Sequence, residues 1–146
     1  MRAVRRPRWI LETVLTDSSK TSPRDPRDPA VRVVLLPKDT NQHGTIFGGI
    51  IMSYIDIAGG VQASRIAGGP VVTVAMKEVV FKQPVMVGEV VSFYAETVRV
   101  GRTSVTVHVD VEVDRSGRLI PVTAADIVFV AVDGNGRPRP IATGGG

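Results

Sequence analysis

The 146-residue sequence contains no cysteine and only two histidines, His43 and His108. Without thiols the chain cannot form a disulfide scaffold, a Cys₄ zinc site, an iron–sulfur cluster or a thiol nucleophile. Two histidines supply few ligands for a catalytic zinc, so we expect no metal site. The sequence also lacks an uninterrupted apolar run of about 18 residues, and we therefore expect no membrane span.

Three motifs of common enzyme classes are missing as well. There is no G-x-S-x-G nucleophile elbow, so Ser53 and Ser64 lack the context of a hydrolase triad. Neither G-x-x-x-x-G-K-[ST] nor G-x-G-x-x-G is present, which removes the usual phosphate-loop and dinucleotide-binding interpretations.

The formal net charge of +4 is concentrated near the N-terminus. Residues 1–29 hold seven Lys and Arg against four Asp and Glu, whereas residues 30–146 hold eleven against ten. Because the rest of the chain is nearly neutral, we expect no nucleic-acid-binding surface. The first segment is rich in Pro and poor in apolar residues, and it has no cleavable signal core, which predicts a disordered tail on a cytoplasmic protein. We expect a disordered basic tail at 1–29, one folded domain at 30–141 and a flexible tail at 142–146.

The folded region is predicted to contain one strand, one long helix and four further strands. A Val/Leu run at 31–36 ends at Pro37, and an apolar, small-residue helix follows Phe47 and ends near Gly68. On a helical wheel this helix has no polar face, which predicts a helix that is buried all round. The four later strands are Val-rich segments at 71–81, 90–100, 104–114 and 121–132.

The valines from Val105 to Val113 alternate strictly with polar residues. This period of two predicts an antiparallel sheet with one buried and one exposed face. Turns at 101–102 and 115–117 predict that the last three strands form a meander. The fold class is therefore α+β, with one long helix wrapped by a five-stranded antiparallel sheet in the order β-α-β-β-β-β. Since one helix cannot cover such a sheet, we expect an oligomer.

Asp56 is the first candidate for chemistry, because it lies in an apolar helix where an unpaired buried carboxylate is costly. The alternative is an Asp that faces solvent or pairs with a cation. Gly48 and Gly49 place two amide N–H groups at the positive end of the same helix, where they would stabilise an oxyanion. About 12 Å of helix separates Gly48 from Asp56, so both can act in one reaction only if two subunits share a site.

The loop before the helix holds Asn41, His43 and Gly44, which either meet a ligand or are ordinary turn residues. Guanidinium groups also lie on predicted turns, at Arg102 and at Arg137 and Arg139. Such groups bind phosphates in a bidentate manner, although solvated arginines are the simpler interpretation.

Several segments together resemble the signature of hotdog-fold acyl-CoA thioesterases. They are residues 36–52 (LPKDTNQHGTIFGGIIM) with Asp56 shortly after, then 81–89 (FKQPVMVGE), 100–104 (VGRTS) and 129–140 (FVAVDGNGRPRP). The resemblance covers about residues 30–141. It implies a hotdog fold, a continuous sheet across a homodimer, and a trimer of dimers.

The same resemblance implies hydrolysis of fatty or other acyl-CoA thioesters to CoA and a free acid, without a cofactor. Asp56 matches the carboxylate that activates water or attacks directly, and Asn41 matches an Asn supplied by the opposing subunit. Gly48 and Gly49 match the amides that polarise the thioester oxygen. The residues that match contacts to the substrate and CoA are His43, Gly44, Arg102, Thr103, Ser104, Arg137 and Arg139.

Two other functions stay open. Asp39-Thr40-Asn41-Gln42-His43 partly resembles the D-x-N-P-x-H motif of hotdog hydratases, in which Asp and His carry out acid–base chemistry on an enoyl thioester. The Pro is missing here, and His43 falls one residue early. The second alternative is a non-catalytic acyl-CoA sensor that keeps the fold and the ligand without turnover.

Overall fold

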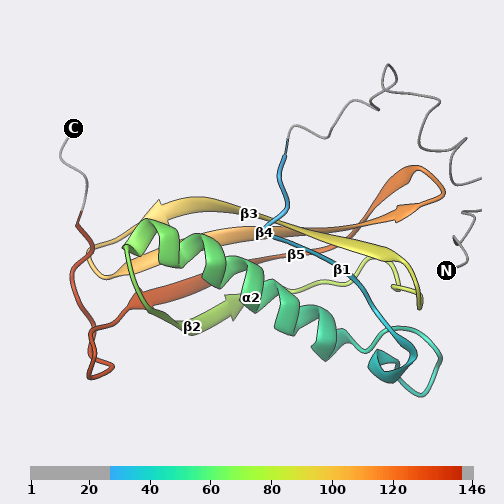
Figure 1. Cartoon of the computed structure of the whole chain (residues 1–146), viewed down its shortest axis with the longest axis horizontal. Coiled ribbons are helices and arrows are strands. Elements are labelled where there is room, and N and C mark those ends of the chain that lie inside the picture. The colour runs from blue at the N-terminus through green and yellow to red at the C-terminus, as the bar shows by residue number, and fades with distance from the viewer. Residues whose placement is uncertain (1–26, 143–146) are drawn as a thin grey trace, which may run out of the picture.

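The computed structural model describes residues 27–142, in which five antiparallel strands form one sheet and one long helix lies across a face of it (Figure 1). The elements along the chain are β1 (Val31–Val34), the short 3-10 helix η1 (Pro37–Asp39), α2 (Gly48–Ala67), β2 (Val71–Lys77), β3 (Val90–Val100), β4 (Ser104–Arg115) and β5 (Arg118–Ala131). Their spatial order in the sheet is β1-β3-β4-β5-β2, which places β1 and β2 at the edges. The α+β class and the hotdog arrangement predicted from the sequence are confirmed.

The predicted tails fall almost entirely outside the described residues, which leave out 1–26 and 143–146. Arg27 is the first described residue, and its guanidinium makes two hydrogen bonds of 3.1 and 3.0 Å to the carboxylate of Glu112 on β4. The same group lies 4.1 Å from the centre of the Tyr94 ring on β3, in cation–π geometry.

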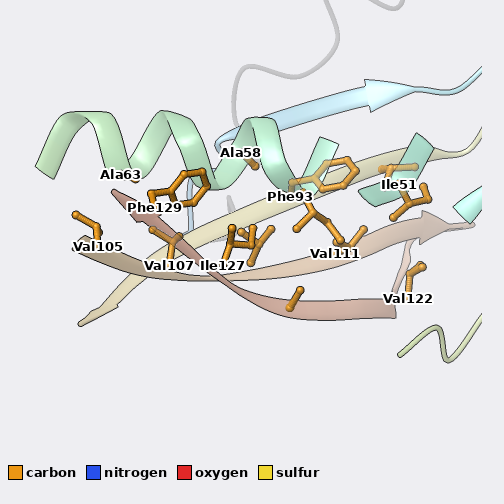
Figure 2. Packing of buried hydrophobic residues seen from close by; sticks show 14 of the residues in the cluster. Ile51, Ala58, Ala63, Phe93, Val105, Val107, Val111, Val122, Ile127 and Phe129 are labelled. Carbon is orange, nitrogen blue, oxygen red and sulfur yellow. The ribbon is translucent and has the colours of Figure 1, made fainter. Parts of the chain in front are cut away.

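Strands β3, β4 and β5 form the predicted meander, in which each strand pairs with the next in antiparallel register. The alternation on β4 is confirmed, because all five valines from Val105 to Val113 are fully buried while the residues between them are partly exposed. The buried side of the sheet packs against α2, and Phe93, Ile127 and Phe129 fill the layer between them (Figure 2). A Cβ added at Gly59 would lie 2.9 Å from both Ile127 and the ring of Phe129, so this glycine allows the helix to approach β5 closely.

The helix departs from one prediction, because it is not buried all round. Its buried face comprises Ile51, Ile55, Ala58, Gly59, Ala63 and Ala67. On other faces Met52, Ile57 and Ile66 are 38%, 51% and 39% exposed. The sheet covers only one side of α2, and within residues 27–142 no other element covers the rest. The apolar exterior of the helix is consistent with a partner molecule on that side.

Three strand boundaries differ clearly from the predictions. β1 ends at Val34 rather than Leu36, because Leu36 is already the N-cap of η1. β2 ends at Lys77 rather than continuing to residue 81, because Glu78 adopts a left-handed backbone conformation with φ of 52° that interrupts the ladder. β5 begins at Arg118, before Pro121, although proline is unfavourable within a sheet. Pro121 is tolerated because it lies opposite Glu112, where the register between β4 and β5 shifts.

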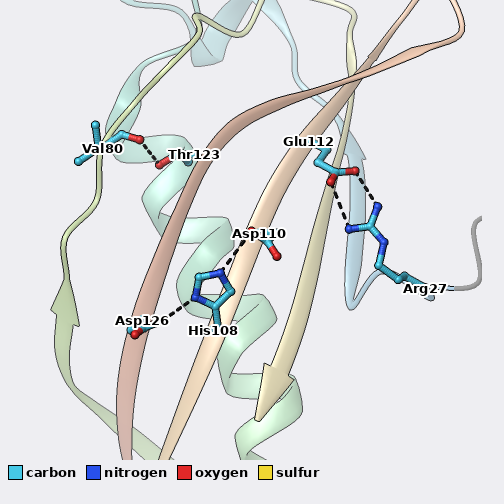
Figure 3. Close-up of polar contacts among 7 residues, drawn as sticks. All are labelled: Arg27, Val80, His108, Asp110, Glu112, Thr123 and Asp126. Atoms are coloured by element: carbon cyan, nitrogen blue, oxygen red, sulfur yellow. Dashed lines mark hydrogen bonds and ion pairs between the residues drawn. The ribbon is translucent and has the colours of Figure 1, made fainter. Parts of the chain in front are cut away.

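The other face of the sheet carries polar side chains. His108 on β4 lies between Asp126 on β5 and Asp110, with Nδ1 2.6 Å from the Asp126 carboxylate and Nε2 3.3 Å from that of Asp110 (Figure 3). The hydrogen bond to Asp126, together with the negative charge of Asp110, raises the pKa of His108 above its usual value, and partial burial opposes this only in part.

Candidate active site

The start of α2 is built by a hydrogen-bonded loop. Asn41 organises this loop, because its side-chain oxygen accepts the backbone N–H groups of His43 and Thr45 at 2.8 and 3.3 Å, and its Nδ2 donates to the Thr45 hydroxyl at 2.9 Å. Gly44 completes the turn with φ of 82°, a conformation that suits glycine. Asn41 is therefore a turn-forming residue, as the simpler interpretation predicted, but one of its side-chain N–H groups is left for a ligand.

The amide groups of Gly48 and Gly49 occupy the first turn of α2. The preceding residue, Phe47, has extended backbone geometry, with φ of −62° and ψ of 129°, and it donates its N–H to the carbonyl of Asp39 at 2.8 Å. Within residues 27–142, neither glycine N–H donates to a protein acceptor. Two donors at the positive end of a 20-residue helix are thus available to an incoming oxygen atom.

A groove of about 300 Å³ adjoins this helix start. Its lining is mostly apolar and comes from the loop before α2, from the helix itself and from the segment between β2 and β3. The lining residues are Thr45, Ile46, Gly48, Ile51, Phe81, Lys82, Gln83, Pro84 and Val85. The ring of Phe81 lies closest to the helix start, where a Cβ added at Gly48 would be 3.4 Å from it. The groove is at the small end of the range for ligand sites.

Asp56 lies two turns further along α2 and is partly buried. Its carboxylate accepts a hydrogen bond of 2.5 Å from the hydroxyl of Thr73 on the edge strand β2. Thr73 was missed from the sequence, because one threonine in a β-branched strand gives no sign of its partner. The hydrogen bond from the strand therefore orients the carboxylate of Asp56 on the helix.

Arg102, Thr103, Ser104, Arg137 and Arg139 gather at the other end of α2. The chain around 131–141 pairs with the turn before β4, through hydrogen bonds from Ala131 N–H to the Thr103 carbonyl and from Ile141 N–H to the Arg102 carbonyl. Arg139 donates from Nη2 to the carbonyl of Ala67, the last residue of the helix, at 2.8 Å, and from Nε to that of Val132 at 3.2 Å. Arg139 thus stabilises the C-terminus of the helix, which its sequence position did not reveal.

In a single chain the predicted residues form three groups. One group lies at the start of α2 and comprises Asn41, His43, Gly44, Gly48 and Gly49. The length of the helix, about 30 Å, separates it from the residues around Arg102 and Arg139 at the other end. Asp56 lies between them, and eight residues of helix put it about 12 Å from Gly48. One chain therefore does not bring the carboxylate and the helix-start amides to one reacting carbon.

His43 and Asp39 do not form an acid–base pair in this loop. The ring of His43 is exposed and lies against the side chain of Gln42. The carboxylate of Asp39 accepts the Leu36 N–H at 3.0 Å and caps η1. Among the described residues no group of three or more His, Asp or Glu could hold a metal ion, and no helix there is long and apolar enough to cross a membrane.

Comparison with known proteins gives consistent matches. The model of the thioesterase superfamily matches residues 43–120. The acyl-CoA thioester hydrolase YciA of Salmonella typhimurium is 42% identical over 120 residues, which cover 79% of this chain and 90% of the relative. The crystal structure of the hexameric thioesterase y2039 from Yersinia pestis superposes with a TM-score of 0.78 at 42% identity, covering 82% of this chain and 98% of that one.

A more distant solved structure is the acyl-CoA hydrolase of Staphylococcus aureus in complex with butyryl coenzyme A and coenzyme A. It has a TM-score of 0.72 at 30% identity and covers 76% of this chain and 69% of that one. The same enzyme has been solved as alanine mutants of an Asn and of an Asp that lie fifteen positions apart. On the matched residues and the shared architecture, this chain belongs to the thioesterase superfamily.

Proposed function

We propose that the protein hydrolyses acyl-CoA thioesters to coenzyme A and a free acid, and that the fatty and other acyl groups of the predicted class are its substrates. The observation that carries this proposal is the pair of amide N–H groups of Gly48 and Gly49, which lack protein acceptors within residues 27–142 and border an apolar groove. A thioester oxygen placed there would gain negative charge in the transition state, where two preorganised donors stabilise it most.

Asp56 activates the water. The carboxylate takes a proton from a water molecule, the water oxygen attacks the thioester carbon, and the oxyanion lies against the helix-start amides. The C–S bond then breaks, the protonated Asp56 returns its proton to the departing thiolate of CoA, and the acid is released with the carboxylate of Asp56 restored. The hydroxyl of Thr73 positions the carboxylate through its 2.5 Å hydrogen bond. Nucleophilic attack by Asp56 itself is the alternative route, and it uses the same groups.

Two subunits complete each site in this proposal. Asp56 lies at the flank of α2, where its carboxylate meets Thr73 of the edge strand β2, and Val72 and Val74 of that strand are exposed. A second copy that covers this apolar surface would bring its own helix start and Asn41 to Asp56. Asn41 then uses its remaining N–H group to orient the water or the thioester. Assembly into a hexamer, the state named for the Yersinia relative, follows as part of the proposal.

The spacing of the two polar residues supports these roles. Asn41 and Asp56 lie fifteen positions apart, as do the Asn and the Asp replaced in the Staphylococcus enzyme. Arg102 and Arg137 are exposed at the other end of α2 and would bind the phosphates of CoA. Arg139 has three N–H donors beyond the two that it spends on backbone carbonyls. Contacts of His43, Gly44, Thr103 and Ser104 with the substrate stay predictions, as does the cytoplasmic location.

The test is CoA release from short, medium, long and aromatic acyl-CoAs by the wild type and Asp56→Ala. The matched control is Glu96→Gln, which removes a carboxylate on the sheet face away from α2. We expect CoA release by the wild type that Asp56→Ala abolishes and Glu96→Gln leaves unchanged. His43→Ala removes a predicted substrate contact, so we expect it to raise KM without abolishing release. Loss of activity in His43→Ala with retention in Asp56→Ala would favour a hydratase. Tight acyl-CoA binding without release in the wild type would favour a sensor.

A further inference from the structure

The wall of the groove beside the helix start is an irregular segment, residues 78–89, between β2 and β3. A segment without strand pairing is held in place by individual contacts rather than by a regular ladder. Its first half is attached to β5, because Lys82 N–H donates to the carbonyl of Val122 at 2.8 Å and the hydroxyl of Thr123 donates to that of Val80 at 2.7 Å (Figure 3). These contacts do not reach the second half of the wall.

The second half is attached by the Gly88 N–H, which donates to the carbonyl of Leu35 at 3.0 Å, and by one side chain, that of Arg115. Its Nε and Nη2 donate to the two carboxylate oxygens of Glu89 at 2.7 and 2.9 Å, and Nη2 also donates to the carbonyl of Pro84 at 3.1 Å. Glu89 in turn accepts the N–H of Met86 at 2.7 Å. The hydrogen bond with Arg115 lowers the pKa of Glu89, against the opposing effect of burial, so the carboxylate is ionised at neutral pH.

This attachment continues to the helix start. Val85, next to Pro84, is buried and its carbonyl accepts the N–H of Ile46 at 2.8 Å. Ile46 is also buried and lies two residues before Gly48. A shift of the wall at Pro84 and Val85 would therefore move the segment that places the helix-start amides. Displacements of about 1 Å at a site are enough to reduce rates substantially.

We infer that Arg115, at the turn between β4 and β5, is a positioning residue that fixes both the groove wall and the helix-start donors through Glu89 and Pro84. Arg115 is not a catalytic residue, since it lines neither the groove nor the helix start. The inference rests on the proposed function for its catalytic consequence, whereas the structural link to Ile46 is independent of it.

The test compares Arg115→Gln with Arg118→Gln, which removes the same charge from the same turn. Arg118 lies opposite Arg115 in the register, and its guanidinium donates to no acceptor within the described residues. We expect Arg115→Gln to lower kcat/KM about tenfold, mainly through kcat, because donors to the transition state are displaced. Glu89→Gln should cause a similar loss, and the double variant little more, because the two residues act as a unit.

Hydrogen exchange of the Ile46 amide gives a readout that needs no substrate. We expect exchange about tenfold faster in Arg115→Gln than in Arg118→Gln at equal thermal stability, because the carbonyl of Pro84, next to Val85, loses the hydrogen bond that fixes this part of the wall. Equal exchange in the two variants would overturn the inference, and so would equal kcat/KM in an active enzyme. If exchange rises but even the wild type releases no CoA, the positioning role stands and the proposed function fails.

Discussion

Replacing Gly48 by proline separates the proposed oxyanion role of the helix start from its structural role. Proline is favoured at the first position of a helix, where its missing N–H would have no helical partner. The residue before it must be extended, and Phe47 already has φ of −62° and ψ of 129°. The backbone can therefore accept Gly48→Pro while one of the two donors disappears.

The expected loss is large and specific to the chemical step. Removal of one oxyanion donor costs about 10²–10³ in kcat, or roughly 2.7–4 kcal/mol of transition-state stabilisation. Gly48→Ala is the matched control, because it keeps the N–H and adds a Cβ 3.4 Å from the Phe81 ring. That contact is tight, and we expect an effect of about threefold or less from a small adjustment of this partly exposed ring.

The assay is steady-state CoA release on the best acyl-CoA of the panel, with circular dichroism and thermal unfolding of each variant. We expect Gly48→Pro to unfold within about 3 °C of the wild type, since the substitution also restricts the unfolded chain. A folded Gly48→Pro with the kcat of Gly48→Ala would refute the oxyanion role of this amide.

Three further outcomes are expected. Gly59→Ala should destabilise the protein by about 1–3 kcal/mol in thermal unfolding, because the new methyl group would lie 2.9 Å from the ring of Phe129; unchanged stability would contradict the close packing of α2 on β5. Thr73→Val should lower kcat about tenfold with little change in KM, whereas Thr73→Ser retains activity, and equal kcat in both would exclude the positioning hydroxyl. Since the hydrogen bond to Asp126 raises the pKa of His108, its stabilisation is complete below the unfolded pKa of about 6.5 and is lost as pH rises through the raised value. The melting temperature of His108→Gln should therefore fall below that of the wild type at pH 5.5 but not at pH 9.

Most of the fold was predictable because its signals are local and repeated. The alternating valines of β4 specify both the register and the buried face, and Gly68, with φ of 68°, ends α2 where the sequence predicted. The prediction that α2 is buried all round, made from its apolar residues on every face, was wrong for the single chain. A helical wheel cannot distinguish burial within one chain from burial by a partner, and Met52 and Ile57 are exposed in the single chain.

The candidate site was predictable only in part, because side-chain partners depend on tertiary contacts. Asn41 and the helix-start glycines are adjacent in sequence, and the motif placed them in one loop. Thr73 reaches Asp56 from a strand seventeen residues away, and Arg139 reaches the end of the helix from seventy-two. Neither contact has a sequence signal, since both require the packing of α2 against the sheet.

The central claim, that Asp56 of one chain works with Asn41 and the helix start of another, is tested most directly by mixing two inactive variants. Asp56→Ala and Asn41→Ala chains carrying different tags would be coexpressed, and mixed oligomers isolated by both tags. In hexamers isolated by both tags about half of the dimers are mixed when the chains pair at random, and each mixed dimer has one intact site, so we predict about a quarter of wild-type CoA release, or about half if the isolated species is a dimer. Mixed dimers with no more activity than either parent would contradict the shared site.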